Sequence, residues 1–300
     1  MIRDFEIKYV NLNNGERLAY REAGKGDKVL LLIHGNMSSG LHYLPVVERL
    51  PEDFKAYFLD LRGFGESSYN KPFDSLKDLS EDVFEFVAAL GLKGFTMVGW
   101  STGGGICMQF DADHPGFAEK LVLIETVSYK GYPLNKKDAA GQPIPGTVYT
   151  AKEEMAQDPV QVAPAIAAME NKDFNYMNFL WDAAIYSCSK PDPEYNQLYI
   201  TETLKQRNLA DIDWALANFN MSHDHNSYTA GSGLIGKVEI PVLSFWGEKD
   251  YVVLGDMVKE TVEAIGDNAE LVILQNSGHS PLVDCPDLLS QKIFDFARQV

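Results

Sequence analysis

The feature that most constrains the fold of this chain is an alternation of strand-like and helix-like segments that is interrupted once. Continuous apolar runs at Val29–Ile33 and Leu121–Ile124 are typical of strands that are buried on both faces. Between them, Leu76–Leu90 repeats apolar residues at helical spacing. Because strands that alternate with helices pack as a mostly parallel sheet, the pattern predicts an α/β fold with helices on both faces of the sheet.

The whole pattern predicts eight strands. They are expected at Phe5–Leu12, Arg17–Glu22, Val29–Ile33, Ala56–Leu59, Phe95–Val98, Leu121–Ile124, Val242–Trp246 and Leu271–Leu274. The first two are joined by the turn signal Asn13-Asn14-Gly15, which favours an antiparallel hairpin. The helices expected around this sheet are His42–Leu50, Leu76–Leu90, Thr102–His114, 255–265 and Asp287–Val300.

The interruption lies between residues 131 and 230, where no buried-strand run occurs. Amphipathic helical segments are expected there near 151–169, 174–187, 194–207 and 211–219. The strand–helix alternation resumes after this stretch, so both halves belong to one sheet. We therefore expect a core formed by residues 1–130 and 231–300, with an inserted helical cap at 131–230.

Charge and composition exclude several classes of partner. The net charge of −17 over 300 residues opposes binding to nucleic acid or to an anionic membrane surface. No apolar run reaches the roughly 18 residues that a membrane span needs. The N-terminal residues lack the pattern of a secretory signal, which predicts a cytoplasmic protein. Three cysteines without a CxxC pair are expected to be reduced, with neither a disulfide framework nor a zinc site.

The segment Gly99-Trp100-Ser101-Thr102-Gly103 fits the pattern G-x-S-x-G and lies between an expected strand and an expected helix. A sharp turn at this point would lift the Ser101 hydroxyl above the sheet, and small residues at both glycine positions allow the tight approach. The helix N-terminus behind the serine favours negative charge, and the Thr102 N–H can point at a developing oxyanion. Ser101 is therefore the candidate nucleophile.

A second candidate donor for the oxyanion follows the strand Val29–Ile33, in the segment His34-Gly35-Asn36-Met37. A loop there can present the backbone N–H of Asn36, with Met37 as the alternative. We interpret His34 as a structural residue that braces this loop, since it precedes the loop and has no proton to move.

The remaining catalytic candidates follow the last two strands. Asp250 comes after Val242–Trp246, and His279 comes after Leu271–Leu274. Open α/β sheets place their sites at the carboxyl ends of strands, and the chain order Ser, Asp, His is the one expected of a G-x-S-x-G hydrolase. Asp250 is thus the expected acid and His279 the expected base, while Glu248 and Glu125 are weaker alternative acids.

Two further motifs are assigned structural roles. In the turn Asp60–Ser67, Asp60 and Arg62 are expected to hold the chain rather than bind an anion. His223 and His225 resemble a metal-binding pair, but no third ligand has a suitable spacing, which predicts a surface or hinge role. No metal and no cofactor are expected.

Taken together, these motifs resemble the α/β-hydrolase superfamily over residues 28 to 281. The resemblance implies the α/β-hydrolase fold and assigns Ser101, Asp250 and His279 to a catalytic triad. Within the superfamily the chain is most similar to the short intracellular poly(3-hydroxybutyrate) depolymerases, which share its length, its lack of a signal peptide and a G-W-S-x-G box. Haloperoxidase-like serine esterases also share an aromatic residue before the serine and S-T-G-G from it onward.

The expected activity is hydrolysis of carboxylic esters. The segment 131–230 has 13 acidic and 7 basic residues, a net of −6, and it is rich in aromatic side chains. These features favour a neutral, fairly apolar ester, including a polyester presented on granules. Candidate substrate contacts are Trp100, Met37, Trp181 and Phe174, the last two as exposed aromatics at the rim of the cap. The alternatives are a carboxylesterase for small acyl esters and a non-catalytic receptor for a small molecule.

Overall fold

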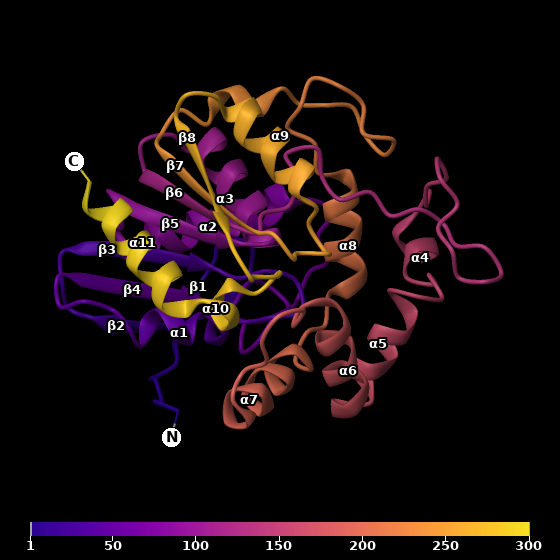
Figure 1. The fold of residues 1–300 in the computed structure, drawn as a ribbon, viewed down its shortest axis with the longest axis horizontal. Coiled ribbons are helices and arrows are strands. Elements are labelled where there is room, and N and C mark those ends of the chain that lie inside the picture. The colour runs from indigo at the N-terminus through magenta and orange to yellow at the C-terminus, as the bar shows by residue number, and fades with distance from the viewer. Residues whose placement is uncertain (1, 300) are drawn as a thin grey trace.

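The computed structural model describes residues 2–299 and contains one eight-stranded sheet in the order β1-β2-β4-β3-β5-β6-β7-β8 (Figure 1). All neighbouring strands are parallel except β2, which runs antiparallel to both β1 and β4. The strands are β1 (Lys8–Asn11), β2 (Arg17–Gly24), β3 (Lys28–Ile33), β4 (Phe54–Leu59), β5 (Phe95–Trp100), β6 (Ala118–Ile124), β7 (Val242–Gly247) and β8 (Ala269–Leu274). All eight predicted strands are confirmed.

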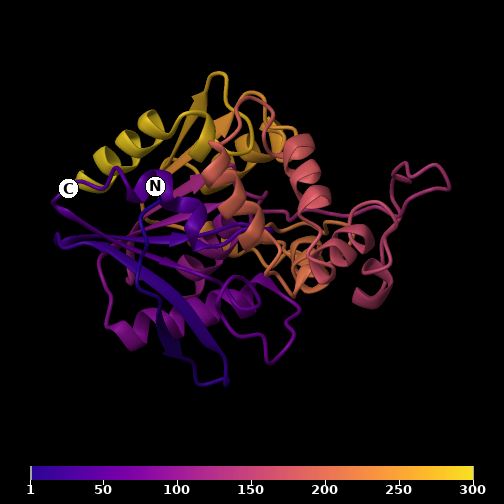
Figure 2. The ribbon, with the colours of Figure 1, turned by 90° about the horizontal axis from the view of Figure 1, so that it is seen from below.

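Helices cover both faces of this sheet, as the alternating pattern predicts. They are α1 (Leu44–Val47), α2 (Leu76–Leu90), α3 (Thr102–Asp113), α9 (Gly255–Ile265), α10 (Pro281–Asp284) and α11 (Pro286–Arg298). Helices α1, α10 and α11 contact one another, and α2 packs against α3. Figure 2 shows α11 and α2 on opposite sides of the sheet. The chain therefore forms three layers, with the sheet in the middle.

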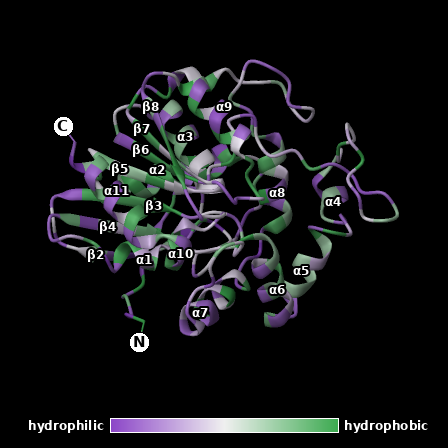
Figure 3. Cartoon of the chain, viewed as in Figure 1, coloured by the Kyte–Doolittle hydropathy of each residue, from purple (hydrophilic) through white to green (hydrophobic). Residues whose placement is uncertain are grey.

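The middle layer is the most hydrophobic part of the molecule. In Figure 3 the central strands are coloured mostly as hydrophobic, whereas the outer helices show both colours. The side chains from Leu30 to Ile33 on β3 are fully buried, as are those from Leu121 to Ile124 on β6. Burial on both faces explains why these two runs are continuous in the sequence rather than alternating.

A helical insert separates β6 from β7 and accounts for the interruption in the sequence pattern. It contains α4 (Lys152–Met155), α5 (Ala163–Glu170), α6 (Phe174–Ala184), α7 (Pro193–Thr203) and α8 (Leu209–Asn218), followed by the short 3₁₀ helix η2 (Leu234–Lys237). Figure 1 shows α4, α5, α6 and α8 to the right of the strands and α7 below them. Within residues 2–299, no helix has both the length and the hydropathy required to cross a membrane.

Two predicted helices differ from the structure for local reasons. The segment expected to be helical at 151–169 is broken between α4 and α5, because Pro159 lacks an N–H and the Asp158 carboxylate accepts the N–H groups of Val160 and Gln161 instead. The segment expected at His42–Leu50 begins earlier, as a 3₁₀ turn (η1, Gly40–Tyr43) capped by Ser39.

Candidate active site

Ser101 lies at the sharp turn between β5 and α3, in a strained backbone conformation with φ 54° and ψ −119°. This conformation is uncommon for a residue with a side chain, and such strain is concentrated at functional sites. The neighbouring glycines permit it. A Cβ at Gly99 would lie 2.5 Å from the Gly103 carbonyl oxygen, and a Cβ at Gly103 would overlap the carbonyl oxygen of Ile33. A larger residue at Gly99 would therefore push α3 away from β5, and a larger residue at Gly103 would push α3 away from β3.

The structure brings the three residues expected to form the triad into one hydrogen-bonded line. The Nε2 atom of His279 lies 3.0 Å from the Ser101 Oγ, and the Nδ1 atom lies 2.8 Å from the Asp250 Oδ2. Both distances are within hydrogen-bond reach, so a proton can pass from the serine to the imidazole. These residues come from the ends of β5, β7 and β8, where the sequence pattern placed them.

Asp250 is held in place by the backbone that follows it. Its Oδ1 accepts the N–H groups of Val252 at 2.8 Å and Val253 at 3.0 Å, which leaves Oδ2 for His279. Burial opposes ionisation of this carboxyl, but the neighbouring His279 and the hydrogen bonds outweigh that effect and lower its pKa. Asp250 is therefore ionised at neutral pH, as the partner of an imidazole that gains a proton must be.

A second carboxyl, Glu125, lies beside Asp250. Its side chain is fully buried at the end of β6, and its Oε1 accepts the Gly247 N–H at 2.7 Å. Burial, and then the charge of Asp250, raise the Glu125 pKa well above its usual value. Both effects favour the protonated form of Glu125, which can donate a hydrogen bond to Asp250. The sequence identified it only as an alternative to Asp250, whereas the structure places the two side by side.

Trp100 braces the loop that carries His279. Its indole Nε1 donates a hydrogen bond of 2.8 Å to the His279 carbonyl oxygen, and its side chain is almost completely buried. The residue before the nucleophile therefore fixes the position of the base as well as lining the cavity. The sequence predicted only the second of these roles, because no local pattern pairs residues 179 positions apart.

The Met37 N–H, the alternative donor for the oxyanion, already has hydrogen-bond partners in the protein. The Met37 N–H is already bonded to the Asn36 Oδ1 at 2.9 Å and to the Gln206 Oε1 at 3.0 Å. An N–H that is shared between two acceptors is not free for a substrate oxygen. The geometry therefore favours the Asn36 N–H, together with the Thr102 N–H in the first turn of α3, over the Met37 N–H.

His34 braces the loop that precedes Asn36, as its position in the sequence suggests. Its Nε2 accepts the Leu61 N–H at 3.0 Å, so its Nδ1 carries the proton and donates to the Gly35 carbonyl at 2.8 Å. Burial lowers the pKa of His34 to about 4. It is therefore a neutral structural histidine.

The turn that contains Asp60 and Arg62 is structural, but the partners differ from those implied by the sequence. Arg62 forms a bidentate ion pair with Asp82 of α2, at 2.5 and 2.7 Å. Asp60 instead contacts Arg21 and accepts the Gly40 N–H at 2.9 Å. Each charge is thus paired with another element of the core, because β2 and α2 both border this turn.

A cavity of about 400 Å³ opens beside the Ser101 hydroxyl. Besides that serine and His279, it is lined by Gly35, Asn36, Met37, Trp100, Thr102, Val127, Tyr132, Leu134, Val160, Gln161, Leu180, Trp181, Ala184, Ile185, Asp213, Leu216, Val252 and Val253. Most of these side chains are apolar, and both the core and the insert contribute to the wall. The cavity is thus suited to a small, largely apolar group held next to the nucleophile.

The candidate substrate contacts are only partly in this cavity. Trp100, Met37 and Trp181 line it, whereas Phe174 does not. Phe174 is half-buried at the start of α6 and packs against the hydrophobic core of the molecule. Trp181 is buried rather than exposed at a rim, because its ring stacks on that of His42 with centroids 5.2 Å apart.

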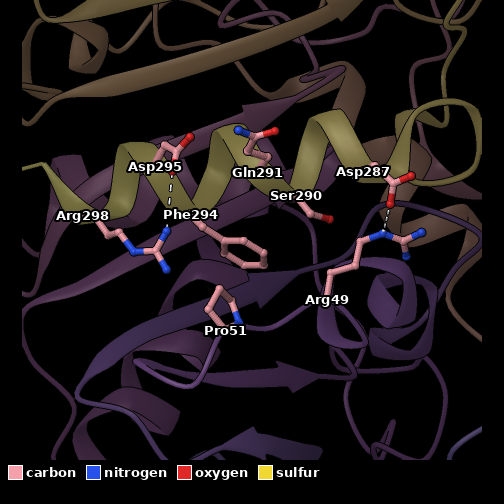
Figure 4. Close-up of a pocket in the computed structure, with 8 residues that line it drawn as sticks. All are labelled: Arg49, Pro51, Asp287, Ser290, Gln291, Phe294, Asp295 and Arg298. Atoms are coloured by element: carbon pink, nitrogen blue, oxygen red, sulfur yellow. Dashed lines mark hydrogen bonds and ion pairs between the residues drawn. The ribbon is translucent and has the colours of Figure 1, made fainter.

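A second cavity, also of about 400 Å³, lies between α11 and the loop after α1 and contains none of the candidate site residues (Figure 4). Its two arginines are paired. Arg49 lies 2.5 Å from Asp287, and Arg298 lies 3.5 Å from Asp295 and 2.8 Å from Asp53. The positive charges of this cavity are thus already neutralised.

The other candidate groups lie outside the active-site cavity. Glu248 is exposed and accepts the Asn276 N–H at 2.9 Å, so it does not contact His279. His223 and His225 are exposed. In residues 2–299, no group of three or more His, Cys, Asp or Glu side chains has an arrangement that could hold a metal ion.

Comparisons with known proteins agree with this geometry. A family model described as alpha/beta hydrolase fold matches residues 28–286. Lipase 1 from Psychrobacter immobilis is 26% identical over 290 residues, which cover 95% of this chain and 81% of the lipase. A pimeloyl-[acyl-carrier protein] methyl ester esterase from Vibrio atlanticus is 22% identical over 95% of this chain and 99% of its own length. The solved structure of an esterase from Exiguobacterium antarcticum superposes with a TM-score of 0.75 at 17% identity, covering 97% of this chain and 99% of the esterase.

Proposed function

Because this chain belongs to the alpha/beta hydrolase family, we propose that it is a serine hydrolase that cleaves carboxylic esters. The observation that carries this proposal is the position of His279, which contacts the Ser101 hydroxyl with one ring nitrogen and the Asp250 carboxylate with the other. Similar proteins named as lipases and esterases support an ester as the substrate.

The reaction follows from this geometry in two halves. His279 Nε2 removes the proton of Ser101, whose Oγ attacks the ester carbonyl carbon to form a tetrahedral intermediate. The imidazolium then gives its proton to the departing alkoxide as the carbon–oxygen bond breaks, which leaves an acyl-serine. Water activated by His279 attacks this acyl-serine and releases the acid. Throughout, Asp250 fixes the tautomer of His279 and stabilises its charged form.

The oxyanion of each tetrahedral intermediate is assigned to the backbone N–H groups of Asn36 and Thr102. Both belong to segments that are fixed before substrate binds, since His34 braces the first and the strained turn at Ser101 sets the second. Loss of one such donor typically costs about 3–4 kcal/mol of transition-state stabilisation.

We assign residues 1–130 and 231–300 to the catalytic core and residues 131–230 to a cap that shapes the substrate cavity. Tyr132, Leu180 and Leu216 of the cap line the cavity together with core residues. The largely apolar wall and the net charge of −6 over 131–230 support a neutral, fairly apolar ester.

A more specific candidate is an intracellular depolymerase of poly(3-hydroxybutyrate) or a related polyester. Its support is the G-W-S-x-G box, whose tryptophan braces the His279 loop, and three cysteines that are all unpaired, which fits a reducing compartment. The second candidate is a carboxylesterase for small acyl esters, which the compact cavity favours.

The first test is covalent labelling with a fluorophosphonate probe, followed by a panel of p-nitrophenyl acyl esters and hydroxybutyrate oligomers. We expect labelling at Ser101 within minutes and turnover of neutral esters. Ser101→Ala should lose labelling and at least about 10⁴-fold in kcat, with its circular dichroism spectrum unchanged. A protein that neither labels nor turns over any ester would instead be a receptor that uses this fold.

The second test separates a polyester depolymerase from a small-ester esterase. Tyr251 and Leu254 are strongly exposed and line an outer groove that shares Tyr132 and Val252 with the active-site cavity. If granules are held there, Tyr251→Ser/Leu254→Ser should lower hydrolysis of polyester granules by about ten-fold or more relative to p-nitrophenyl butyrate.

The matched control for this test is Phe179→Ser. Phe179 is an exposed aromatic on α6 that lines neither the cavity nor the outer groove, and its replacement should leave the activity ratio unchanged. A wild-type protein that ignores granules and hydroxybutyrate oligomers would leave the small-ester carboxylesterase as the function.

A further inference from the structure

The active-site cavity contains one acidic side chain that the proposed mechanism does not use. Among the side chains that line the cavity, Asp213 is the only carboxyl. Asp213 is contributed by α8 of the cap and is half-buried in the cavity wall. A carboxyl in a mostly apolar wall needs a physical explanation, because it is costly to bury and adds nothing to apolar binding.

Asp213 has one hydrogen bond and no ion pair within residues 2–299. Its Oδ1 accepts the Asn36 Nδ2 at 3.1 Å. The orientation of the Asn36 amide is set by its other contacts, since its Oδ1 accepts the Gln206 Nε2 at 2.8 Å and the Met37 N–H at 2.9 Å. Asn36 therefore cannot reverse its amide, and the Asp213 Oδ2 remains open to the cavity.

Asp213 also has no positively charged partner among residues 2–299. Burial, and then the nearby charge of Asp158, raise its pKa to about 7, although the Asn36 hydrogen bond opposes this shift. No cation within residues 2–299 pairs with this carboxylate, in contrast to Asp82, which pairs with Arg62. A half-buried carboxylate that has no ion pair and lines the same cavity as a nucleophile is a candidate ligand contact.

We propose that Asp213 determines substrate specificity by accepting a hydrogen bond from a hydroxyl group of the bound ester. This inference rests on the proposed function, and it adds that the preferred substrates are esters with a free hydroxyl a few atoms from the scissile carbonyl. The position follows from Asn36, whose backbone N–H is assigned to the oxyanion while its side chain contacts Asp213. A neutral hydroxyl fits better than an anion, which the carboxylate repels, or an ammonium group, whose desolvation is costlier in this cavity.

The test compares two esters that differ by a single hydroxyl, p-nitrophenyl butyrate and p-nitrophenyl 3-hydroxybutyrate. The wild type should have the higher kcat/KM for the hydroxylated ester. Asp213→Leu, which removes the acceptor at similar volume, should lower the hydroxylated-to-plain ratio of kcat/KM by about ten-fold or more, because a site built to bind a hydroxyl discriminates strongly. Asp213→Asn keeps a neutral acceptor and should give an intermediate ratio.

The control is Asp182→Asn, which removes a cap carboxylate that pairs with Lys190 and does not line the cavity. It should leave the ratio unchanged, and the rate of fluorophosphonate labelling of Ser101 reports whether each variant keeps an intact site. A ratio that is the same in wild type and Asp213→Leu, with both esters turned over, would overturn the role of Asp213 alone. Absence of turnover of both esters would overturn the proposed function, and this inference with it.

Discussion

The two walls of the active-site cavity are built on different principles. On the core wall, every polar group at Ser101, His279 and Asp250 has a defined partner, and these partners come from strand ends that the sheet holds in register. On the cap wall, most lining side chains are apolar, and the acidic group Asp213 keeps one oxygen without a protein partner.

This difference separates the chemistry from the choice of substrate. Strand ends in a sheet cannot move independently, so the core wall can hold reacting atoms within hydrogen-bond distance before substrate arrives. The cap helices that line the cavity, α6 and α8, are not part of the sheet, so their positions depend on side-chain packing rather than on a hydrogen-bonded ladder. Substitutions in the core wall should therefore affect all substrates, whereas those in the cap wall should distinguish between substrates.

The largest expected effect is a loss of kcat at Asp250, and it tests the role of the core wall. Asp250→Asn should lower kcat by about 10⁴-fold for every ester, because the amide favours the wrong tautomer of His279. Glu248→Gln, two residues away and exposed, is the matched control and should retain wild-type activity. Steady-state kinetics on two unrelated p-nitrophenyl esters measure both. If the loss at Asp250 differed strongly between the two esters, the core wall would also be selecting substrates.

A smaller effect on kcat is expected at Glu125, whose buried side chain lies beside Asp250. Glu125→Gln should keep kcat within a few-fold, since the amide can still accept the Gly247 N–H and donate to Asp250. Glu125→Ala leaves a cavity and an unpaired Gly247 N–H, so it should lower the free energy of unfolding by about 1–3 kcal/mol and kcat by roughly ten-fold. Urea denaturation and kinetics on purified variants test this. A fully inactive Glu125→Gln with normal stability would instead make Glu125 the principal acid.

The last prediction concerns the cap wall. We expect Asp213 to make the free energy of unfolding depend on pH. Asp213 has a pKa of about 7 in the folded protein, above the value of an ordinary aspartate. Between the unfolded-state pKa and pH 7, the folded state therefore binds more protons than the unfolded state, and stability falls as pH rises through this window. Asp213→Asn removes this loss.

The measurement is urea denaturation of wild type and Asp213→Asn at pH 5 and pH 8. Relative to wild type, the variant should gain about 2–3 kcal/mol of unfolding free energy between the two pH values. An equal difference at both values would show that Asp213 ionises like an exposed carboxyl.

Much of the catalytic core was predictable from the sequence because its determinants are local. Buried strands are visible in the sequence as apolar runs such as Val29–Ile33, and the bounds of α2 follow from helical spacing. The glycines around Ser101 mark a sharp turn. The order of the strand ends that carry Ser101, Asp250 and His279 then follows from the alternation itself.

Tertiary structure alone decided the contacts that join distant segments. The bond from Trp100 to the His279 carbonyl, the pairing of Arg62 with Asp82 and the position of Glu125 beside Asp250 all depend on how elements pack. The burial of Trp181 against His42, and the absence of Phe174 from the cavity wall, depend on how the cap sits on the core. Helical periodicity shows which residues share a face, but not what that face meets. Only packing placed the carboxyl of Asp213 in the wall of the cavity that contains Ser101.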